Sequence, residues 1–346
     1  MTAPAAAPST ATATTFAAAL NTAMSDAMEH DDSVVVFGED VGTLGGVFRI
    51  TDGLTKRFGP ERCFDTPLAE SGIAGTAVGM AINGLKPVIE MQFDAFAYPA
   101  LEQIFSHIAK MANRTRGRVR LPIVIRIPYG GGVGGVEHHC DSSEAYYAHT
   151  AGLKVFTPAT VADAYLMLRE AIDTQDPVVF FEPKKLYWSK DAADLSALRL
   201  QYEDSQGGRV GAQGAAQIRR SGTDVSLITY GPSVPTALKA ADLAAEDGVS
   251  VEVLDLRSIV PFDDAALMRT VEKTGRAVVV AEAQGFASVS SEIVARIQER
   301  CFHSLASPVL RVTGFDVPYP APKLEEHHLP TVDRILDALD ELQWED

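Results

Sequence analysis

A single glutamate, Glu70, stands at the start of an uncharged stretch of small and apolar residues, residues 70–81 of the segment DTPLAESGIAGTAVGMA. Gly72, Gly75 and Gly79 fall three and four residues apart, which predicts a helix with a close-packing face. A glutamate in the first turn of a helix commonly does no more than complement the helix dipole. Because the residues around Glu70 are apolar and cramped, we expect its carboxylate to be desolvated and suited to share a proton with a ligand nitrogen.

A glycine-rich stretch, YGGGVGG at residues 129–135, leads to His138 and His139. It contains G-x-G-x-x-G, but the next strand lacks the acid of a dinucleotide site, and the stretch lacks the Gly-Lys-Ser/Thr of a P-loop. A flexible lid or a close approach of the backbone to a ligand is the better interpretation. Adjacent histidines are poor joint zinc ligands. A histidine on such a loop can donate to a substrate carboxylate or carbonyl, and a surface histidine is an equally good interpretation.

Gln92, Phe93 and Phe96 directly follow an expected strand. Ordinary packing is one interpretation of these three residues. Beside Glu70 they would equally supply a hydrogen bond and an aromatic face to a flat heterocycle.

Two histidines near the end of the chain, His327 and His328, follow Glu325 and Glu326 and resemble metal ligands only superficially. We expect them to form a solvated segment before the last helix. The proline-rich residues 316–320 are expected to be a structural connection.

Apolar strands alternating with amphipathic helices must position these side chains. The expected strands of the first half are residues 33–37, 87–91, 121–128, 154–156 and 178–181, and the helices include residues 54–58, 70–81, 99–113 and 161–172. A second set has strands at residues 225–230, 250–254, 277–281 and 309–313, and helices at residues 234–246, 263–274, 288–301 and 331–342. Strands apolar on both faces and alternating with helices predict largely parallel sheets covered on each side.

Four polar segments follow strands or strand-like segments directly: Glu39 and residues 65–70, 92–96 and 129–139. Ligands of such sheets collect beyond the carboxyl ends of the strands. We therefore expect these segments to converge on one edge of the first sheet.

The fold class predicted is α/β with two domains. We expect a disordered tail at residues 1–14, a first domain at residues 15–190, a linker at residues 191–214, where periodicity fades, and a second domain at residues 215–346.

Composition excludes several classes of protein. With 346 residues and 46% hydrophobic composition the chain is long enough for about two cores. A net charge of -16 argues against a nucleic-acid or anionic-membrane binder. The three cysteines are far apart, which suggests neither a disulfide framework nor a thiolate zinc site and fits a reducing compartment. Without a basic leader or a run of eighteen apolar residues, we expect a cytoplasmic protein.

Several motifs in order resemble one known family. They are GEDV at residues 38–41, GGVFR at 45–49, DTPLAESGIAG at 65–75, EMQF at 90–93, AHTAGLKVFTP at 148–158, FFEPK at 180–184 and RVTGFDVPYP at 311–320. The chain is similar to the beta subunit of the thiamine-diphosphate-dependent, decarboxylating component of 2-oxo acid dehydrogenase complexes. That resemblance covers nearly all of residues 15–342 and implies a transketolase-like fold, with a pyrimidine-binding first domain and a transketolase C-terminal-like second domain.

The resemblance also implies roles for single residues. Glu70, Gly75 and Gly79 match the family's pyrimidine-binding signature, with Thr76 in its apolar slot. In that family the glutamate hydrogen-bonds a ring nitrogen of the aminopyrimidine and promotes deprotonation of the thiazolium carbon. The implied cofactor contacts are Glu39, Leu68, Glu70, Gln92 and Phe96, and the implied catalytic residues are Glu70 and His139. Phe96 stands where tyrosine is common, and residues 140–144 depart from the family's usual sequence after the histidine.

Two ions belong to this expectation. The resemblance places a structural potassium ion at the carbonyl groups of Ile123, Ala171, Thr174 and Asp176, with Thr174 replacing a common aspartate. Thiamine-diphosphate enzymes hold magnesium and diphosphate with a Gly-Asp-Gly segment, which this sequence lacks. We therefore expect an alpha subunit to hold the magnesium and diphosphate end of the cofactor, in an α2β2 heterotetramer.

The GGVFR motif is more similar to branched-chain 2-oxo acid dehydrogenases than to pyruvate enzymes. The expected activity is that of a 3-methyl-2-oxobutanoate dehydrogenase, with acyl transfer to the lipoyl group of a dihydrolipoyl acyltransferase core. A pyruvate or acetoin dehydrogenase beta subunit is the alternative, and a noncatalytic docking subunit is an alternative from another class.

Overall fold

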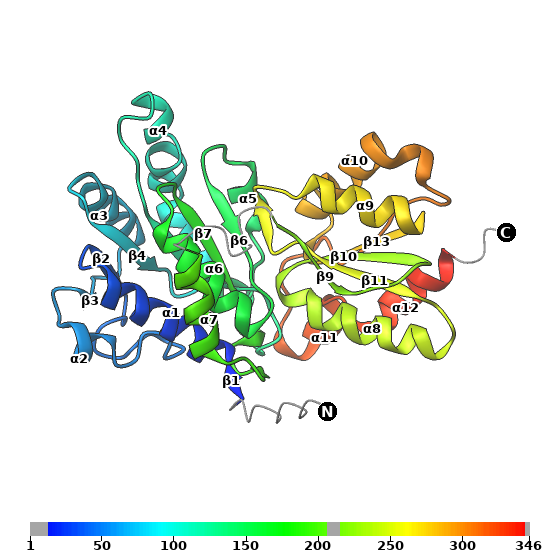
Figure 1. Ribbon diagram of the computed structural model, residues 1–346, viewed down its shortest axis with the longest axis horizontal. Helices are drawn as coiled ribbons and strands as arrows, with labels where there is room; N and C mark the ends of the chain where they lie inside the picture. Colours follow the sequence, from blue (N-terminus) through cyan, green and yellow to red (C-terminus); the bar gives the residue numbers. More distant parts are fainter. Residues whose placement is uncertain (1–12, 206–214, 343–346) are drawn as a thin grey trace, which may run out of the picture.

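The computed structural model describes residues 13–205 and 215–342, which form two α/β domains side by side (Figure 1). Residues 1–12 of the expected tail and 206–214 of the expected linker lie outside the described residues. Thr14 and Thr15 form a short strand, β1 (Thr14–Thr15), that pairs antiparallel with β8 (Lys190–Asp191). The expected linker also contains a helix, α7 (Leu195–Asp204), which Asp194 caps by accepting from the backbone N–H of Ser196 and Ala197. The described parts of the expected tail and of the expected linker therefore contain regular secondary structure.

A seven-stranded sheet organises the first domain, in the order β12-β6-β7-β5-β4-β2-β3. Its strands are β2 (Val34–Gly38), β3 (Cys63–Asp65), β4 (Lys86–Glu90), β5 (Val124–Tyr129), β6 (Lys154–Phe156), β7 (Val178–Pro183) and β12 (Ser258–Val260). Only β12 runs antiparallel to its neighbour, and it comes from the second half of the chain. The expected, largely parallel sheet is confirmed. Because β12 pairs with β6, it links the second half of the chain to the first sheet.

Alternate residues of the strands enter two cores, one on each face of the first sheet. Val34 and Val36 pack with α1 (Phe16–His30) and α6 (Val161–Asp173), whereas Val35 and Phe37 pack with α3 (Glu70–Ile82) and the segment after β4. The second of these cores continues into the second domain through residues such as Ile228. This continuity explains why the domains lie against each other.

The segment expected as one helix at residues 99–113 is divided into three pieces. A 3-10 turn (Ala95–Ala100), a wide π-helical turn (Gln103–Ile108) and a short α4 (Met111–Arg114) follow one another. Pro99 lies inside the first piece and has no N–H to donate, which disfavours a continuous α-helical ladder there. The first part of this segment carries Phe96 toward the sheet edge.

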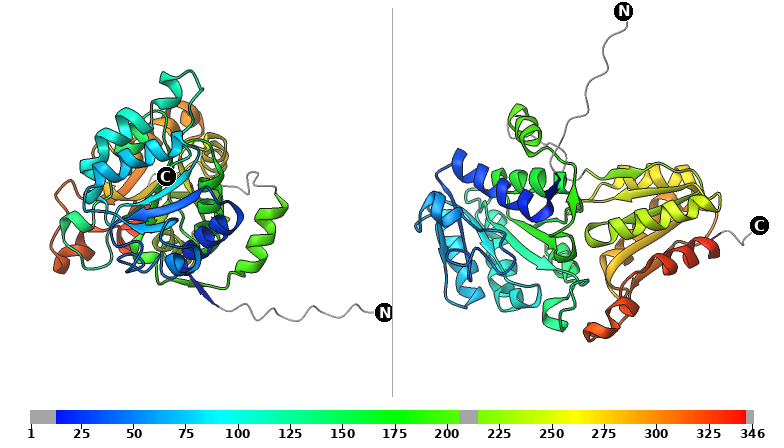
Figure 2. Two further views of the ribbon diagram at one scale, coloured as in Figure 1. Left: turned by 90° about the vertical axis from the view of Figure 1, so that its left-hand side faces the viewer. Right: turned by 90° about the horizontal axis from the view of Figure 1, so that it is seen from below.

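The second domain has a five-stranded sheet in the order β14-β13-β10-β11-β9. Figure 2 (right) shows this domain beside the first. Its strands are β9 (Gln217–Arg220), β10 (Val225–Thr229), β11 (Val251–Asp255), β13 (Ala277–Gln284) and β14 (Leu310–Gly314), and its helices include α8 (Val234–Glu246), α9 (Asp264–Thr274), α10 (Val289–Cys301), α11 (Glu325–His328) and α12 (Val332–Glu341). The remaining helices of the first half are α2 (Leu54–Phe58) and α5 (Glu144–His149). Only the edge strand β9 is antiparallel, so the sheet is largely parallel as expected. Within the described ranges, no helix is both long and apolar enough to cross a bilayer.

Candidate active site

Four neighbouring strands, β5, β4, β2 and β3, end at one edge of the first sheet. The segments that follow them carry His139, Gln92 with Phe96, Glu39, and Leu68 with Glu70, so the predicted convergence on one sheet edge is confirmed. Gly38 allows the close pairing of β2 with β4, because a Cβ there would lie 2.6 Å from the carbonyl oxygen of Glu90. The sheet thus brings together residues that are up to a hundred positions apart.

Two acidic side chains, Glu39 and Glu70, lie at this edge and are both buried, at 6% and 9% exposure. Glu70 is the first residue of α3, as the sequence predicts. Burial, together with the charges of Glu70 and Asp40, raises the pKa of Glu39 from 4.5 to about 7. Within the described residues, Glu39 Oε1 and Thr66 Oγ1 are buried without a hydrogen-bond partner. Buried polar atoms of this kind fit a ligand that supplies polar groups of its own.

The expected close-packing face of α3 is only partly covered within the described chain, which corrects the prediction: Gly75 is half-buried, and a Cβ there would lie 3.6 Å from Gln103 Oε1. Gly72 and Gly79 are exposed, and a Cβ at Gly79 would meet nothing within 4 Å. Nearby Leu68 is 79% exposed, a high value for an apolar side chain in a proposed site. The helix buries its Ile73 and Ala77 face instead, because that face meets the sheet. The parts of the helix surface at Gly72 and Gly79 remain exposed.

His139 stands against two aromatic rings. Its ring centroid lies 4.4 Å from that of Phe93 and 5.2 Å from that of Phe96, edge to face in both cases. His139 Nδ1 is buried and has no hydrogen-bond partner among the described residues. His138, by contrast, is exposed. The structure therefore separates the two histidines and places only His139 beside Phe96.

Gln92 is held by a neighbouring carboxylate. Its Nε2 donates to Asp40 Oδ2 over 3.0 Å, which links the segments after β4 and β2. Asp40 has a positive φ of 59°, a conformation uncommon for residues other than glycine. The tight turn at Asp40 directs its side chain toward Gln92 and keeps Glu39 at the sheet edge.

The glycine-rich stretch approaches the second domain, which the sequence did not indicate. Backbone N–H groups of Gly131, Gly132 and Gly134 donate to carboxylates of Glu282 and Glu325. A Cβ at Gly131 would collide with the hydroxyl of Tyr319, so the close approach is to a side chain of the second domain. No local sequence signal pairs residues about 150–190 positions apart.

The segment around His328 is only partly solvated, which corrects a further expectation. His327 and Glu326 are exposed, whereas His328 and Glu325 are buried at 5% and 8% exposure. The physical reason is that Tyr319 donates to Glu325 and stacks edge-on to His328 at 5.2 Å. Residues 316–320 therefore do more than connect, because they cover this segment.

A buried arginine joins three strands beneath the site. Arg126 on β5 is fully buried and donates to Glu90 on β4 at 2.6 Å and to Glu182 on β7 at 2.7 and 3.0 Å. Tyr187 also donates to Glu182. Glu90 is two residues before Gln92, so this network fixes the strand ends from which the site begins.

The residues expected to hold potassium lie near a lysine. Lys154 Nζ donates to Thr174 Oγ1 over 2.9 Å and lies 3.2 Å from Asp176 Oδ2. The Ile123 carbonyl accepts from the backbone N–H of Val178. Ala171 lies in the last turn of α6, where carbonyl oxygens lack helical partners. Carbonyl oxygens are ligands that suit a hard monovalent cation. Lys154 already places one positive charge beside this segment.

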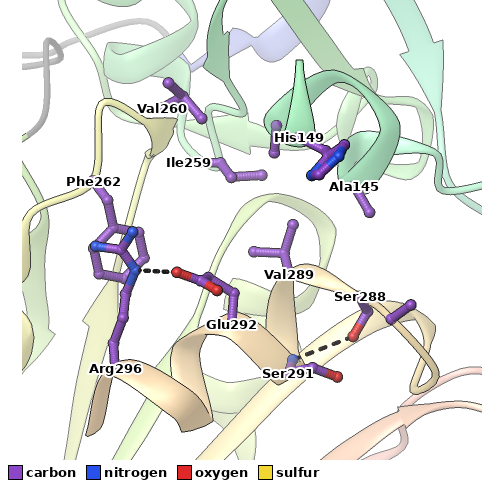
Figure 3. A pocket seen from close by; sticks show the side chains of 12 residues that line it. Ala145, His149, Ile259, Val260, Phe262, Ser288, Val289, Ser291, Glu292 and Arg296 are labelled. Carbon is purple, nitrogen blue, oxygen red and sulfur yellow. Dashed lines mark hydrogen bonds and ion pairs between the residues drawn. The ribbon is translucent and has the colours of Figure 1, made fainter. Parts of the chain in front are cut away.

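Two of the cavities in the described part of the chain bear on the site. One of about 230 Å³ lies along α3 and includes Thr66 and Ala69, next to Glu70. Another of about 530 Å³ lies between the domains, with His149 of α5 lining one side and Glu292 and Arg296 of α10 lining the other (Figure 3). None of the predicted site residues lines the larger cavity, so cavity size alone would point away from the converging side chains.

Two family models match the chain. The pyrimidine-binding domain of transketolase matches residues 12–189, and the transketolase C-terminal domain matches residues 214–335. A solved structure titled as a split-gene transketolase, an inactive beta4 tetramer, superposes with a TM-score of 0.76 over 95% of this chain and 98% of its own, at 21% identity. The last comparison shows the fold alone, and it confirms the transketolase-like architecture.

Curated relatives are similar over almost their whole length. The pyruvate dehydrogenase E1 component subunit beta of Leifsonia xyli subsp. xyli is 51% identical, over 93% of this chain and 92% of the relative. The 3-methyl-2-oxobutanoate dehydrogenase subunit beta of Mycobacterium tuberculosis is 49% identical, over 94% and 91%. The pyruvate dehydrogenase E1 component subunit beta of Bacillus subtilis is 44% identical, over 94% of this chain and 97% of the relative.

Proposed function

Because the chain belongs to the beta subunits of the E1 component of thiamine-dependent 2-oxo acid dehydrogenases, we propose that it forms half of a decarboxylating active site. The observation that carries this proposal is the placement of Glu70 at the start of α3, beside the buried and partly unpartnered Glu39. A carboxylate at that place can hold a proton against a ring nitrogen of a bound heterocycle.

Thiamine diphosphate fits the side chains at the sheet edge. We propose that Glu39, Leu68, Glu70, Gln92 and Phe96 hold its pyrimidine half. When bound, the cofactor supplies the nucleophilic carbon and the electron sink for loss of carbon dioxide from a 2-oxo acid. The protein's part is to orient the ring, to exclude water and to manage the proton at Glu70. His139 then serves the transfer of the acyl group to a lipoyl group.

An alpha subunit would complete the site. The exposed Gly72 and Gly79 of α3 and the 79% exposed Leu68 support a partner chain at this edge, and the sequence has no Gly-Asp-Gly segment for magnesium. We propose an α2β2 heterotetramer in which the alpha subunit holds the magnesium and diphosphate end, and which delivers the acyl group to a dihydrolipoyl acyltransferase core.

The substrate proposed is 3-methyl-2-oxobutanoate, because of the GGVFR motif at residues 45–49. The 51% identical relative favours pyruvate as the second candidate, against 49% for the branched-chain relative. Decarboxylation by the reconstituted α2β2 enzyme, measured with each 2-oxo acid in turn, tests the choice. A kcat/KM higher for 3-methyl-2-oxobutanoate supports the proposal, and one higher for pyruvate contradicts it.

Three further proposals accompany this function. A potassium ion would be held by the main-chain carbonyl groups of Ile123, Ala171, Thr174 and Asp176, supported by the helix end at α6. We propose that the two domains comprise residues 15–190 and 215–346. A cytoplasmic location is supported by three free, buried cysteines, Cys63, Cys140 and Cys301.

A further inference from the structure

The loop that carries His139 is closed at its base within the first domain. Gly130 N donates to the carbonyl of Asp141 over 2.9 Å, and Tyr98 Oη donates to Asp141 Oδ2 over 2.7 Å. Ser143 N donates to the fully buried Asp94 over 2.9 Å. The first domain thus fixes both ends of residues 131–140. The tip of the loop, residues 132–134, is bound by a residue from elsewhere in the chain.

The tip of this loop is held by Glu325 of the second domain. Gly132 N donates to Glu325 Oε1 over 2.8 Å, and Gly134 N donates to Oε2 over 3.1 Å, so both carboxylate oxygens are engaged. Tyr319 Oη donates to Oε1 over 2.6 Å. Gly132 and Gly134 have φ values of 82° and 68°, conformations that favour glycine. Glycine at both positions lets two N–H groups reach one carboxylate.

A second carboxylate supports the same loop. Glu282 on β13 is buried and accepts from Gly131 N, while Lys185 Nζ donates to its other oxygen over 2.9 Å. A carboxylate that accepts from backbone N–H groups makes charge-assisted hydrogen bonds, which are stronger than neutral ones. The second domain, which contributes none of the proposed cofactor contacts, therefore binds the glycine part of this loop through three backbone N–H groups.

We infer that Glu325 is a positioning residue for His139, through which the second domain affects the rate of the acyl-transfer step. Only four residues separate Gly134 from His139, and they end in a tight 3-10 turn (Glu137–His139). The space beside Gly135 is filled, because a Cβ there would lie 2.7 Å from Cys140 Sγ and 3.4 Å from His139 Cβ. A shift at Gly134 is therefore passed on to the imidazole and changes its place against Phe93. This inference rests on the proposed function, since it assigns His139 to acyl transfer.

Glu325→Gln in the α2β2 complex tests the inference. The amide keeps the size of the side chain but offers one acceptor oxygen instead of two, so one of the two loop N–H groups loses its partner. Glu326→Gln is the matched control, because Glu326 is the next residue and is exposed. The readouts are hydrogen exchange of residues 131–139 and the kcat and KM of lipoyl-domain acylation.

We expect faster exchange of the loop in Glu325→Gln than in the wild type and in Glu326→Gln. The acylation kcat should fall by roughly 10²-fold, the loss that a misplacement of about 1 Å produces, while KM for the 2-oxo acid changes little. Exchange and kcat equal to those of Glu326→Gln would overturn the inference, and so would faster exchange with an unchanged kcat.

A second variant keeps the test decisive if Glu325→Gln does not assemble. Tyr319→Phe removes only the hydroxyl that donates to Glu325, and it should give a smaller change of the same sign in both readouts. No change in either would overturn the inference. Failure of the proposed function is distinguishable, because a wild-type complex without 2-oxo acid decarboxylation shows it directly, while loop exchange still reports the Glu325 contact.

Discussion

The carboxylate of Glu70 lies close enough to that of Glu39 for its charge to add to the effect of burial, and together they raise the pKa of Glu39 to about 7. Of the two, only Glu39 keeps a buried oxygen for which no partner is described. The pair places one readily protonated carboxyl beside the proposed catalytic one, which has consequences for stability as well as for cofactor binding.

Replacement of Glu39 should reduce the pH dependence of stability. A carboxyl whose pKa is raised on folding contributes stability below its ordinary pKa of 4.5 and loses it as the pH rises through about 7. The wild type should therefore lose more stability between pH 5 and pH 8 than Glu39→Gln does. Urea unfolding of both proteins at the two pH values measures this, and equal losses would refute the prediction.

Glu70→Gln should lower turnover by roughly 10²–10⁴-fold, the range for a positioned acid-base group, with assembly intact. The amide keeps the shape of the side chain but cannot exchange a proton with the ring nitrogen. Glu61→Gln, at an exposed position before β3, is the control. Decarboxylation by the reconstituted enzyme is the measurement, and unchanged activity would favour the noncatalytic docking subunit.

His139→Ala should impair acylation of a lipoyl domain by roughly 10²-fold, because the imidazole beside Phe93 and Phe96 would be lost. His138→Ala is the control, since that side chain is exposed. Mass spectrometry of the lipoyl domain follows the step. Equal rates in the two variants would mean that His139 has been assigned the wrong role.

Arg126→Met should destabilise the protein by about 3–5 kcal/mol, because it leaves Glu90 and Glu182 buried without their cation. Arg118→Met, at an exposed position, should have an effect within about 0.5 kcal/mol. Urea unfolding gives both values. A loss in Arg126→Met no larger than that in Arg118→Met would contradict the prediction.

Potassium should stabilise the chain relative to a large organic cation at equal ionic strength. An ion that binds only the folded state raises the midpoint of unfolding, by about 2–4 °C for each kcal/mol in a domain of roughly 150–250 residues. The response should persist in Lys154→Met, because the proposed ligands are main-chain carbonyls. Identical melting curves in potassium and tetramethylammonium chloride would exclude the site.

The sequence predicted those parts of the molecule that depend on local periodicity. The buried strand at Val34–Gly38 and the helix that begins at Glu70 follow from runs of apolar residues and from spacing. Their convergence followed from a general property of parallel sheets. Contacts between distant segments were missed: the strand Ser258–Val260 added to the edge of the first sheet, and the two hydrogen bonds from the glycine-rich stretch to Glu325. No local pattern encodes such pairs, because they are selected by packing between domains.

The packing of α3 could be predicted only in part from the sequence, because it too depends on contacts between distant segments. The spacing of Gly72, Gly75 and Gly79 predicted close packing, yet among the described residues only half-buried Gly75 meets another segment, at Gln103, while Gly72 and Gly79 are exposed. A single sequence does not distinguish a face buried by its own chain from one available to a partner. The exposed Leu68 beside it supports the second reading.

If this chain holds only half of a shared cofactor site, turnover must require both subunits, and assays of the separated and the mixed subunits measure this. The purified chain, supplied with thiamine diphosphate, magnesium and 3-methyl-2-oxobutanoate, should release no carbon dioxide. Addition of the alpha subunit should produce both an α2β2 species in gel filtration and decarboxylation. Sustained decarboxylation by the chain alone would contradict the account.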